Sequence, residues 1–340
     1  MTASMHIAQQ VDLSALNTLG LPVIAAHYAE PTTISELQQL LAEAHRQHWP
    51  VAVLGGGSNV IPAPYMEGLV IRYAGTDTHI EVHGSSGLLH ASGGADWPSL
   101  VATTAEAGWW GIENLALIPG SAGAAPVQNI GAYGVEIGEL IERVVYVDRA
   151  DSSVKTLSAA ECGFGYRDSV FKHALSEHAI IVEIVLRVNR NAVPRLGYAD
   201  LAQRVGLPAT PKAVADAVSA IRRDKLPNPQ QLANAGSFFK NPTVPESVAI
   251  ALAERYPEMP RYPAAGGVKL AAGWLIDRCG LKGFKSGHFG IHERQALVIV
   301  HFGGGSAQEL GVFANTIAEQ VEGRFGVQLE QEPRFLGFPA

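Results

Sequence analysis

Residues 118–134 read IPGSAGAAPVQNIGAYG, and this segment is the most informative about the fold of the chain. The segment is long, small in its side chains and free of charged residues, unlike an ordinary surface loop. Clearing side chains from a loop lets its backbone lie against a large flat ligand. A loop that has collapsed onto the protein for structural reasons is the alternative.

A second glycine-rich segment, GGGSN at 55–59, follows the apolar strand expected over 51–54. Consecutive glycines let backbone N–H groups point into one concavity that accepts phosphate oxygens. Pro62 and Pro64 exclude the helix of a Rossmann unit, and the Gly-Lys-Ser/Thr of a P-loop is missing. A plain tight turn is the alternative for this segment alone. Two such loops together indicate a dinucleotide with a ring system, and FAD satisfies both requirements.

Helix and strand signals are mixed along the chain, which predicts an α+β protein. Thr33-Ile-Ser-Glu36 and Ser306-Ala-Gln-Glu309 are capping boxes that open amphipathic helices. Thr210-Pro211 places a capping residue before a proline at the first helical position, so a helix is expected over 213–223. Further helices are expected over 97–107, 245–256 and 269–279. Strands are expected over 51–54, 69–73, 79–83, 88–92, 143–148, 180–188, 296–301 and 327–336.

Charge and composition describe a globular protein that acts on a small molecule. The chain has 340 residues, 47% hydrophobic and 17% charged, with a net charge of -7, so nucleic acid and anionic membrane surfaces are not expected partners. Between 201 and 290, however, 12 Lys and Arg stand against 6 Asp and Glu. This local excess indicates a small anionic ligand, and a solvated basic face is the alternative.

The cysteines, the histidines and the N-terminus give no sign of a disulfide, a metal site, a signal peptide or a membrane span. Cys162 and Cys279 show no pairing pattern, so neither a disulfide framework nor a zinc site is expected. His288 and His292 are four apart, but the glycines around them argue against a helix and thus against a metal site. The first residues lack a signal peptide pattern, and no apolar run approaches the length of a membrane span. We expect a cytoplasmic protein without a metal.

Residues 234–242, NAGSFFKNP, are better suited to a reactive loop than to a helix or a hydrophobic core. Glycine and proline break regular structure there, while Ser237, Lys240 and Asn241 offer a hydroxyl, a cation and an amide. The alternative is a surface turn in which Ser237 caps its own backbone.

Arg167 and Glu332 are two further candidates for handling charge. Arg167, within GYRDSVFK at 165–172, presents paired donors on a planar fork that stays charged. Its alternative is an ion pair at the surface. Glu332 lies in the expected last strand, where Pro333 favours an extended backbone, and the pattern alone favours a carboxylate in water.

Taken together, these segments resemble the UDP-N-acetylenolpyruvoylglucosamine reductases, flavoenzymes that complete UDP-N-acetylmuramate in bacterial peptidoglycan synthesis. The resemblance spans nearly the whole chain, because the order and spacing of the segments match, including KLAAGWLID at 269–277 and the terminal EPRFLG. The chain is similar to the longer subtype, in which tyrosines matching Tyr198 and Tyr262 close over the nucleotide, the second from an extra loop. Pro333 departs from the aliphatic residue usual in relatives, which puts the hydrogen bonding of the last strand in doubt.

The resemblance implies an FAD-binding domain in two parts, of the vanillyl-alcohol-oxidase (PCMH) type. These parts are 1–75 and 76–205, with 327–340 returning to the first part, and an α+β domain over 206–326 binds the UDP-sugar. FAD is bound without a covalent link. The implied cofactor contacts are Gly55, Gly56, Gly57, Ser58, Asn59, Pro119, Gly120, Ser121, Gly123, Gln128, Asn129, Gly131, Ala132 and Tyr133.

The resemblance also implies a reaction and its residues. NADPH reduces the flavin, and UDP-N-acetylglucosamine enolpyruvate then receives hydride at its terminal carbon. Arg167 and Glu332 match the positions that stabilise the resulting enolate, and Ser237 matches the proton donor. Because a serine hydroxyl is a very weak acid, Lys240, backbone dipoles or water are expected to support the alkoxide or relay the proton. The implied substrate contacts are Tyr166, Tyr198, Lys225, Asn241, Tyr262 and Gln295. A monomer is expected.

Two other functions compete with this interpretation. A flavin oxidase of the same fold would need no separate cationic region, and it often attaches its flavin through a histidine, which neither glycine-rich loop contains. A sugar-nucleotide sensor without activity would not need Ser237, Arg167 and Glu332 together.

Overall fold

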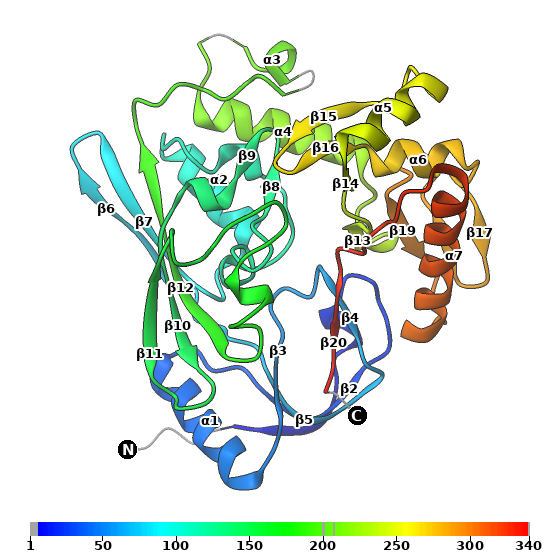
Figure 1. The fold of residues 1–340 in the computed structure, drawn as a ribbon. Helices are drawn as coiled ribbons and strands as arrows, with labels where there is room; N and C mark the ends of the chain where they lie inside the picture. The colour runs from blue at the N-terminus through cyan, green and yellow to red at the C-terminus, as the bar shows by residue number, and fades with distance from the viewer. Residues whose placement is uncertain (1–5, 199–200, 207, 339–340) are drawn as a thin grey trace.

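The computed structural model describes residues 6–198, 201–206 and 208–338 (Figure 1). Residues 1–5, part of the N-terminal stretch discussed above, lie outside the described residues, as do 339–340 of the segment expected to return. Helices and strands are mixed throughout, as the capping and periodicity signals predict.

The N-terminal part is a four-stranded sheet in the order β1-β2-β5-β3, with β1 antiparallel and the others parallel. The expected capping box at Thr33 and Glu36 opens helix α1 and places its apolar side against this sheet. The same core includes Ile180 and Val182 of the next sheet, so α1 joins the two. The elements are β1 (Ala8–Asp12), β2 (Ile24–Ala29), α1 (Ile34–Gln47), β3 (Val51–Val53) and β5 (Tyr65–Ile71).

The middle part is an antiparallel five-stranded sheet in the order β11-β10-β12-β7-β6. Its strands are β6 (Thr78–His83), β7 (Ser86–Ser92), β10 (Ile141–Asp148), β11 (Val154–Ser158) and β12 (Ala179–Asn189). Helix α2 (Trp97–Glu106) and helix α4 (Pro211–Lys225) pack on it, and the glycine-rich segment leads into the small hairpin β8 (Gly131–Ala132) and β9 (Val135–Glu136). Short helices here are η2 (Glu113–Leu115), η3 (Ala122–Ala124), η4 (Ile137–Glu139), η5 (Val170–Lys172) and α3 (Leu201–Arg204).

The C-terminal part has its own core around helices α5, α6 and α7. One sheet runs in the order β13-β19-β18-β17 and another in the order β14-β16-β15. The capping box at Ser306 and Glu309 opens α7, as expected. The elements are β13 (Ala233–Ser237), β14 (Thr243–Val244), α5 (Glu246–Arg255), β15 (Arg261–Ala264), β16 (Gly267–Leu270), α6 (Ala272–Arg278), β17 (Lys285–Ser286), β18 (Phe289–Ile291), β19 (Val298–His301) and α7 (Ala307–Phe325).

After α7 the chain returns to the N-terminal part. Strand β20 (Arg334–Leu336) pairs in parallel with β4 (Val60–Pro62), which directly follows the first glycine-rich loop (Figure 1). Just before β20, Gln331 forms an isolated bridge with Phe239, beyond the end of β13. The returning segment therefore touches both the N-terminal and the C-terminal part.

Three sequence expectations differ from the structure. Lys269 and Leu270 belong to strand β16, because they pair across a hairpin with β15, so the expected helix begins only at Ala272. The expected strand over 327–336 is reduced to β20 and the bridge at Gln331, since the segment changes its partner midway. Tyr262, expected in a loop, lies in β15.

The expected domain boundaries stay predictions, but the packing of α4 bears on one of them. The apolar side of α4, including Val214, Val218 and Ile221, belongs to the core of the middle sheet. A boundary after α4, near Pro227, therefore suits this packing better than one at 206.

Candidate active site

The two glycine-rich loops lie directly against each other. A Cβ atom added at Gly56 would stand 2.6 Å from the Cα atom of Gly120, so Gly56 leaves no room for a side chain there. The Ser58 hydroxyl donates to the Pro119 carbonyl at 2.9 Å, and the Asn59 amide donates to Gln128. The loops form one surface that is largely backbone, as a planar ligand or a phosphate requires.

The backbone donors of the first loop are free of protein partners. Within the described part of the chain, no N–H group of residues 55–59 donates a hydrogen bond to another protein group. Consecutive N–H groups left free in a glycine turn form a concavity that binds anionic oxygens. These donors fit the diphosphate of FAD, and the side-chain-poor surface beside them fits its flat ring.

The side chain of Asn129, expected as a cofactor contact, is bound by protein groups, and the contact stays a prediction. Its side chain is 2% exposed and donates to Glu136 and to the Gly165 carbonyl, both at 2.8 Å, while its oxygen accepts from the Gly138 N–H. Because protein groups use both ends of the amide, the side chain holds the second glycine-rich loop against the turn that carries Arg167.

Arg167 lies in a tight turn with an unusual backbone. Gly165 and Asp168 exchange two backbone hydrogen bonds of 3.0 and 3.1 Å, and Arg167 between them has φ 53°. Turns that need positive φ at this position favour glycine, and a residue with a Cβ atom costs about 1 to 2 kcal/mol there. Strain of this kind clusters at functional sites, where surrounding contacts maintain it.

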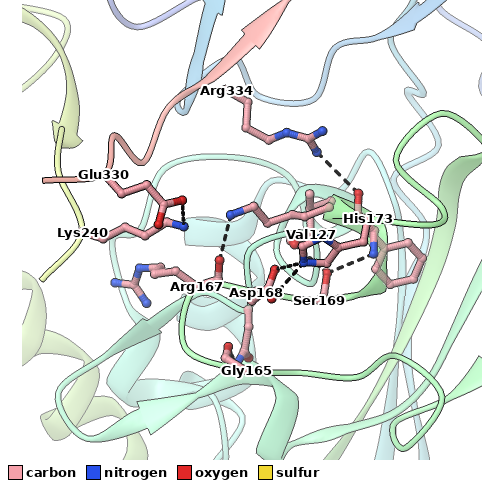
Figure 2. Close-up of polar contacts among 12 residues, drawn as sticks. Val127, Gly165, Arg167, Asp168, Ser169, His173, Lys240, Glu330 and Arg334 are labelled. Carbon is pink, nitrogen blue, oxygen red and sulfur yellow. Dashed lines mark hydrogen bonds and ion pairs between the residues drawn. The ribbon is translucent and has the colours of Figure 1, made fainter. Parts of the chain in front are cut away.

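The turn aims the Arg167 guanidinium at Glu332. Its Nε donates to Glu332 Oε1 at 2.9 Å, and Nη2 donates to the Gly131 carbonyl at 3.2 Å. The expected alternative, an ion pair in water, is wrong, because the two side chains are 20% and 10% exposed. Asp168 instead pairs with His173 (Figure 2).

The backbone of Glu332 is hydrogen-bonded both to the first glycine-rich loop and to the segment that carries Ser237. Its N–H donates to the Phe238 carbonyl at 2.8 Å, and its carbonyl accepts from the Asn59 side chain at 3.2 Å. The next N–H donor is that of Arg334, which bonds the Asn59 carbonyl at 3.0 Å. Pro333 therefore lies where the returning segment changes its backbone hydrogen-bond partner from Phe238 to Asn59.

Burial raises the pKa of the Glu332 carboxyl, and the nearby Arg167 only partly opposes this. The folded protein thus holds a proton on Glu332 at pH values where the unfolded chain has lost it. A carboxylic acid with a raised pKa destabilises the fold as pH rises from its ordinary value, near 4.3, through the folded value.

We expect Glu332→Gln to remove this pH-dependent loss of stability. The variant should gain in free energy of unfolding relative to the wild type as pH rises, and the difference should shrink in acid. Urea unfolding between pH 4 and pH 8 measures it. Glu319→Gln, on the exposed face of α7, controls for the change in net charge. A difference that is constant with pH would contradict the assignment.

Ser237 ends β13 at an irregularity in its pairing with β19. Gly236, with φ 71°, and an N–H bond of 2.8 Å to the Asn234 side chain shape the turn before it. Among the described residues the Ser237 hydroxyl has no hydrogen-bond partner, so the expected alternative of a self-capping serine does not hold. The Lys240 ammonium contacts Glu330 (Figure 2), rather than supporting Ser237 directly as expected.

Only some of the residues expected to contact the substrate lie close to other residues of the site. Asn241 lies close to the Tyr166 hydroxyl, and burial raises the pKa of Tyr166. The Asn241 oxygen, however, accepts from the Ala272 N–H at 2.9 Å and so helps to hold the start of α6. Tyr198 meets Tyr133 edge to face at a centroid distance of 5.5 Å.

The remaining expected contacts lie on separate elements. Tyr262 is 57% exposed on the β15–β16 hairpin, and Lys225 is exposed at the end of α4. Gln295 lies next to α6, 3.6 Å from a Cβ atom added at Gly273. These positions stay predictions of substrate contact.

Two cations near the site were missed by sequence reasoning. The Lys269 ammonium lies 3.6 Å from the centroid of the Tyr166 ring. Arg222 on α4 donates its Nε to the Leu117 carbonyl at 3.3 Å and has no carboxylate partner among the described residues. Burial lowers the pKa of Arg222, and Arg167 adds to this. The only signal was the basic run at 222–225.

Comparisons with known proteins agree with this geometry. A family model described as an FAD binding domain matches residues 25–158, and one described as the C-terminal domain of UDP-N-acetylenolpyruvoylglucosamine reductase matches 228–336. No helix among the described residues has the length and apolar character needed to cross a bilayer.

Relatives of the same name match over almost their whole length. The UDP-N-acetylenolpyruvoylglucosamine reductase of Chromobacterium violaceum is 45% identical over 98% of this chain and 100% of its own. That of Neisseria gonorrhoeae is 44% identical over 97% of each chain. The crystal structure of the Thermus caldophilus reductase superposes with a TM-score of 0.67 at 24% identity, covering 97% of this chain and 98% of its own, and shows the same fold. The chain therefore belongs to the UDP-N-acetylenolpyruvoylglucosamine reductase family, with an FAD-binding domain in its first half.

Proposed function

We propose that this protein reduces UDP-N-acetylglucosamine enolpyruvate to UDP-N-acetylmuramate with NADPH, as a cytoplasmic monomer. One observation carries the proposal. The segment around Glu332 is hydrogen-bonded to Asn59 of the first glycine-rich loop on one side and to Phe238, next to Ser237, on the other. These bonds support placing the loops suited to FAD and the segment that carries Ser237 in one site.

Bound FAD supplies hydride transfer, from NADPH to the enolpyruvyl double bond of the substrate. The residues of the chain handle the charge and the proton that remain. Hydride addition to the terminal carbon leaves an enolate beside a carboxylate, and its negative charge must be stabilised before a proton arrives. The Arg167 guanidinium supports this role, because it is permanently charged and already fixed by Glu332 and the Gly131 carbonyl.

Glu332 contributes to the same task in two ways. Its contact of 2.9 Å with Arg167 Nε fixes the orientation of the guanidinium. Its raised pKa favours the protonated form, which does not repel a developing anion. Ser237 then donates a proton to the adjacent carbon, and no hydrogen bond to a described residue competes with the substrate for its hydroxyl.

The substrate's diphosphate requires cations, and the local positive excess over 201–290 supplies them. We assign Lys225, Asn241 and Gln295 to the sugar nucleotide, and Tyr166 to the reacting end. Tyr198 and Tyr262, 53% and 57% exposed, are assigned to closing over the nucleotide. Arg222 joins this set as a cation beside Arg167.

The competing functions fit the site less well. An oxidase of a simple alcohol would not use cations such as Arg222 and Lys225, which have no carboxylate partner within the described part of the chain. A binding protein without activity would gain nothing from a buried Glu332 that positions a strained Arg167.

The proposal predicts a yellow protein that consumes NADPH only when the enolpyruvyl sugar nucleotide is present. NADPH absorbance measures this directly, and UDP-N-acetylglucosamine, which lacks the double bond, is the matched control. Mass spectrometry of the product is expected to show UDP-N-acetylmuramate. A folded preparation that binds no FAD, or one that consumes NADPH equally with both nucleotides, would defeat the proposal.

A further inference from the structure

The side chain of Lys172 is hydrogen-bonded to the strained turn that carries Arg167. Its Nζ donates to the carbonyl oxygen of Arg167 at 2.9 Å, from the end of the short helix η5. Among the described residues this is the only hydrogen bond to that carbonyl, because the two backbone bonds of the turn join Gly165 and Asp168 instead. The peptide that follows Arg167 is therefore held on both sides, because its N–H, from Asp168, donates to the Gly165 carbonyl at 3.1 Å and its carbonyl oxygen accepts from Lys172.

That peptide matters because it is one of the two backbone links that fix the conformation of Arg167 in the turn. With φ 53°, Arg167 occupies a backbone conformation that residues with a Cβ atom adopt only when other contacts hold them. If the carbonyl lost its contact with Lys172 and the turn relaxed toward an ordinary backbone conformation, the guanidinium would move away from Glu332 Oε1 and the Gly131 carbonyl. A shift of about 1 Å in a positioned catalytic group costs about 100-fold in rate.

The residues next to Lys172 in η5 are hydrogen-bonded to two other parts of the site, which fixes the position of Lys172. The Ser169 hydroxyl, which caps η5, donates to the Val127 carbonyl of the second glycine-rich loop at 2.6 Å (Figure 2). Arg334 Nη1 of the returning strand donates to the Phe171 carbonyl at 3.4 Å (Figure 2). The residues around Lys172 in η5 are thus tied both to the loop suited to the flavin and to the returning segment that carries Glu332.

The surroundings also show that Lys172 is not an ordinary surface lysine. It is partly buried, and burial, followed by the neighbouring Lys240, lowers its pKa. Lys240 contacts Glu330, whereas Lys172 directs a hydrogen bond to a backbone carbonyl. A partly desolvated ammonium beside another cation is unfavourable unless a specific contact offsets it.

We propose that Lys172 is a positioning residue, whose hydrogen bond to the Arg167 carbonyl keeps the Arg167 guanidinium aligned with Glu332 during the reduction of the enolpyruvyl group. Lys172 touches neither the flavin nor the substrate in this proposal and acts only through Arg167. The inference rests on the proposed function, because alignment of Arg167 has a measurable effect only if the enolate forms.

Steady-state kinetics of Lys172→Met test the proposal. We expect kcat to fall about 100-fold while KM for the sugar nucleotide changes by no more than about twofold, because only the transition-state contact is lost. Lys172→Arg, which restores a cationic donor, is expected to recover most of kcat. Lys212→Met, which removes an exposed lysine bound to Asp216, is the matched control and is expected to keep wild-type kcat.

A double-mutant cycle distinguishes action through Arg167 from a separate role. In an Arg167→Lys background the further loss caused by Lys172→Met is expected to be less than about threefold, because no guanidinium remains to be aligned. Equal losses in both backgrounds would overturn the proposal, as would an unchanged kcat or an effect on KM alone. If Lys172→Met does not fold, as thermal unfolding would show, Lys172→Ala, which also lacks a donor, carries the same test. Absence of activity in the wild type would instead refute the proposed function.

Discussion

Replacing Ser237 with alanine is expected to leave reduction of the flavin by NADPH nearly unchanged and to slow its reoxidation by the enolpyruvyl substrate about 10⁴-fold. The value is at the upper end of the range for removing a general acid. Ser237 ends β13 with a hydroxyl that no described residue binds, so its loss disturbs no protein contact. Anaerobic stopped-flow spectroscopy, with NADPH added first and substrate second, separates the two half-reactions.

Ser247→Ala provides the control, because Ser247 is an exposed serine on α5. It is expected to match the wild type in both half-reactions. Equal slowing of both half-reactions in Ser237→Ala would show a damaged flavin site rather than a missing proton donor, and unchanged reoxidation would assign the proton to another group.

Arg167→Met is expected to reduce kcat about 10³-fold, at the upper end for the loss of one preorganised donor to an oxyanion. The same change leaves Glu332 buried without its cation, because their contact of 2.9 Å is lost. The pKa of Glu332 is then expected to rise further, since burial raises it and Arg167 is the largest opposing influence. Steady-state kinetics give kcat, and unfolding as a function of pH gives the shift at Glu332.

Arg187→Met is the matched control for Arg167. Arg187 also contacts a glutamate at 2.9 Å, Glu142, but the two side chains are 49% and 44% exposed. An exposed ion pair contributes little to stability and nothing to the reaction, so wild-type kcat is expected. A loss in Arg167→Met no larger than that in Arg187→Met would remove Arg167 from the catalytic group.

The elements predicted well from the sequence are those that local residues specify. The capping boxes at Thr33 and Ser306 and the proline at 211 fixed the starts of three helices, because these signals act within one turn. The glycine-rich loops were recognised for a similar reason, since missing side chains are visible in sequence. Their contact between Gly56 and Gly120 was not predicted, because it joins distant segments.

The parts of the site that sequence reasoning could not supply depend on distant contacts. The pattern around Glu332 favoured a carboxylate in water, yet the return of the chain buries it beside Arg167. The positive φ of Arg167 leaves no mark in the sequence, because arginine has no preference for it. Lys269 was assigned to a helix, since its apolar neighbours suit both helix and strand and only the hairpin with β15 decides between them.

The return of the chain through residues 331–336 has a consequence for synthesis in the cell. The hydrogen bond between Asn59 and Glu332 spans 273 positions, so the ribosome releases this segment only after the segments it joins. Until then β4 lacks the neighbour it has in β20 and presents an open edge on which nascent chains could pair with each other. Such late closure also makes the final folding step slow, because distant ends must meet. Ribosome-bound chains that stop before residue 331 are therefore expected to need chaperones most.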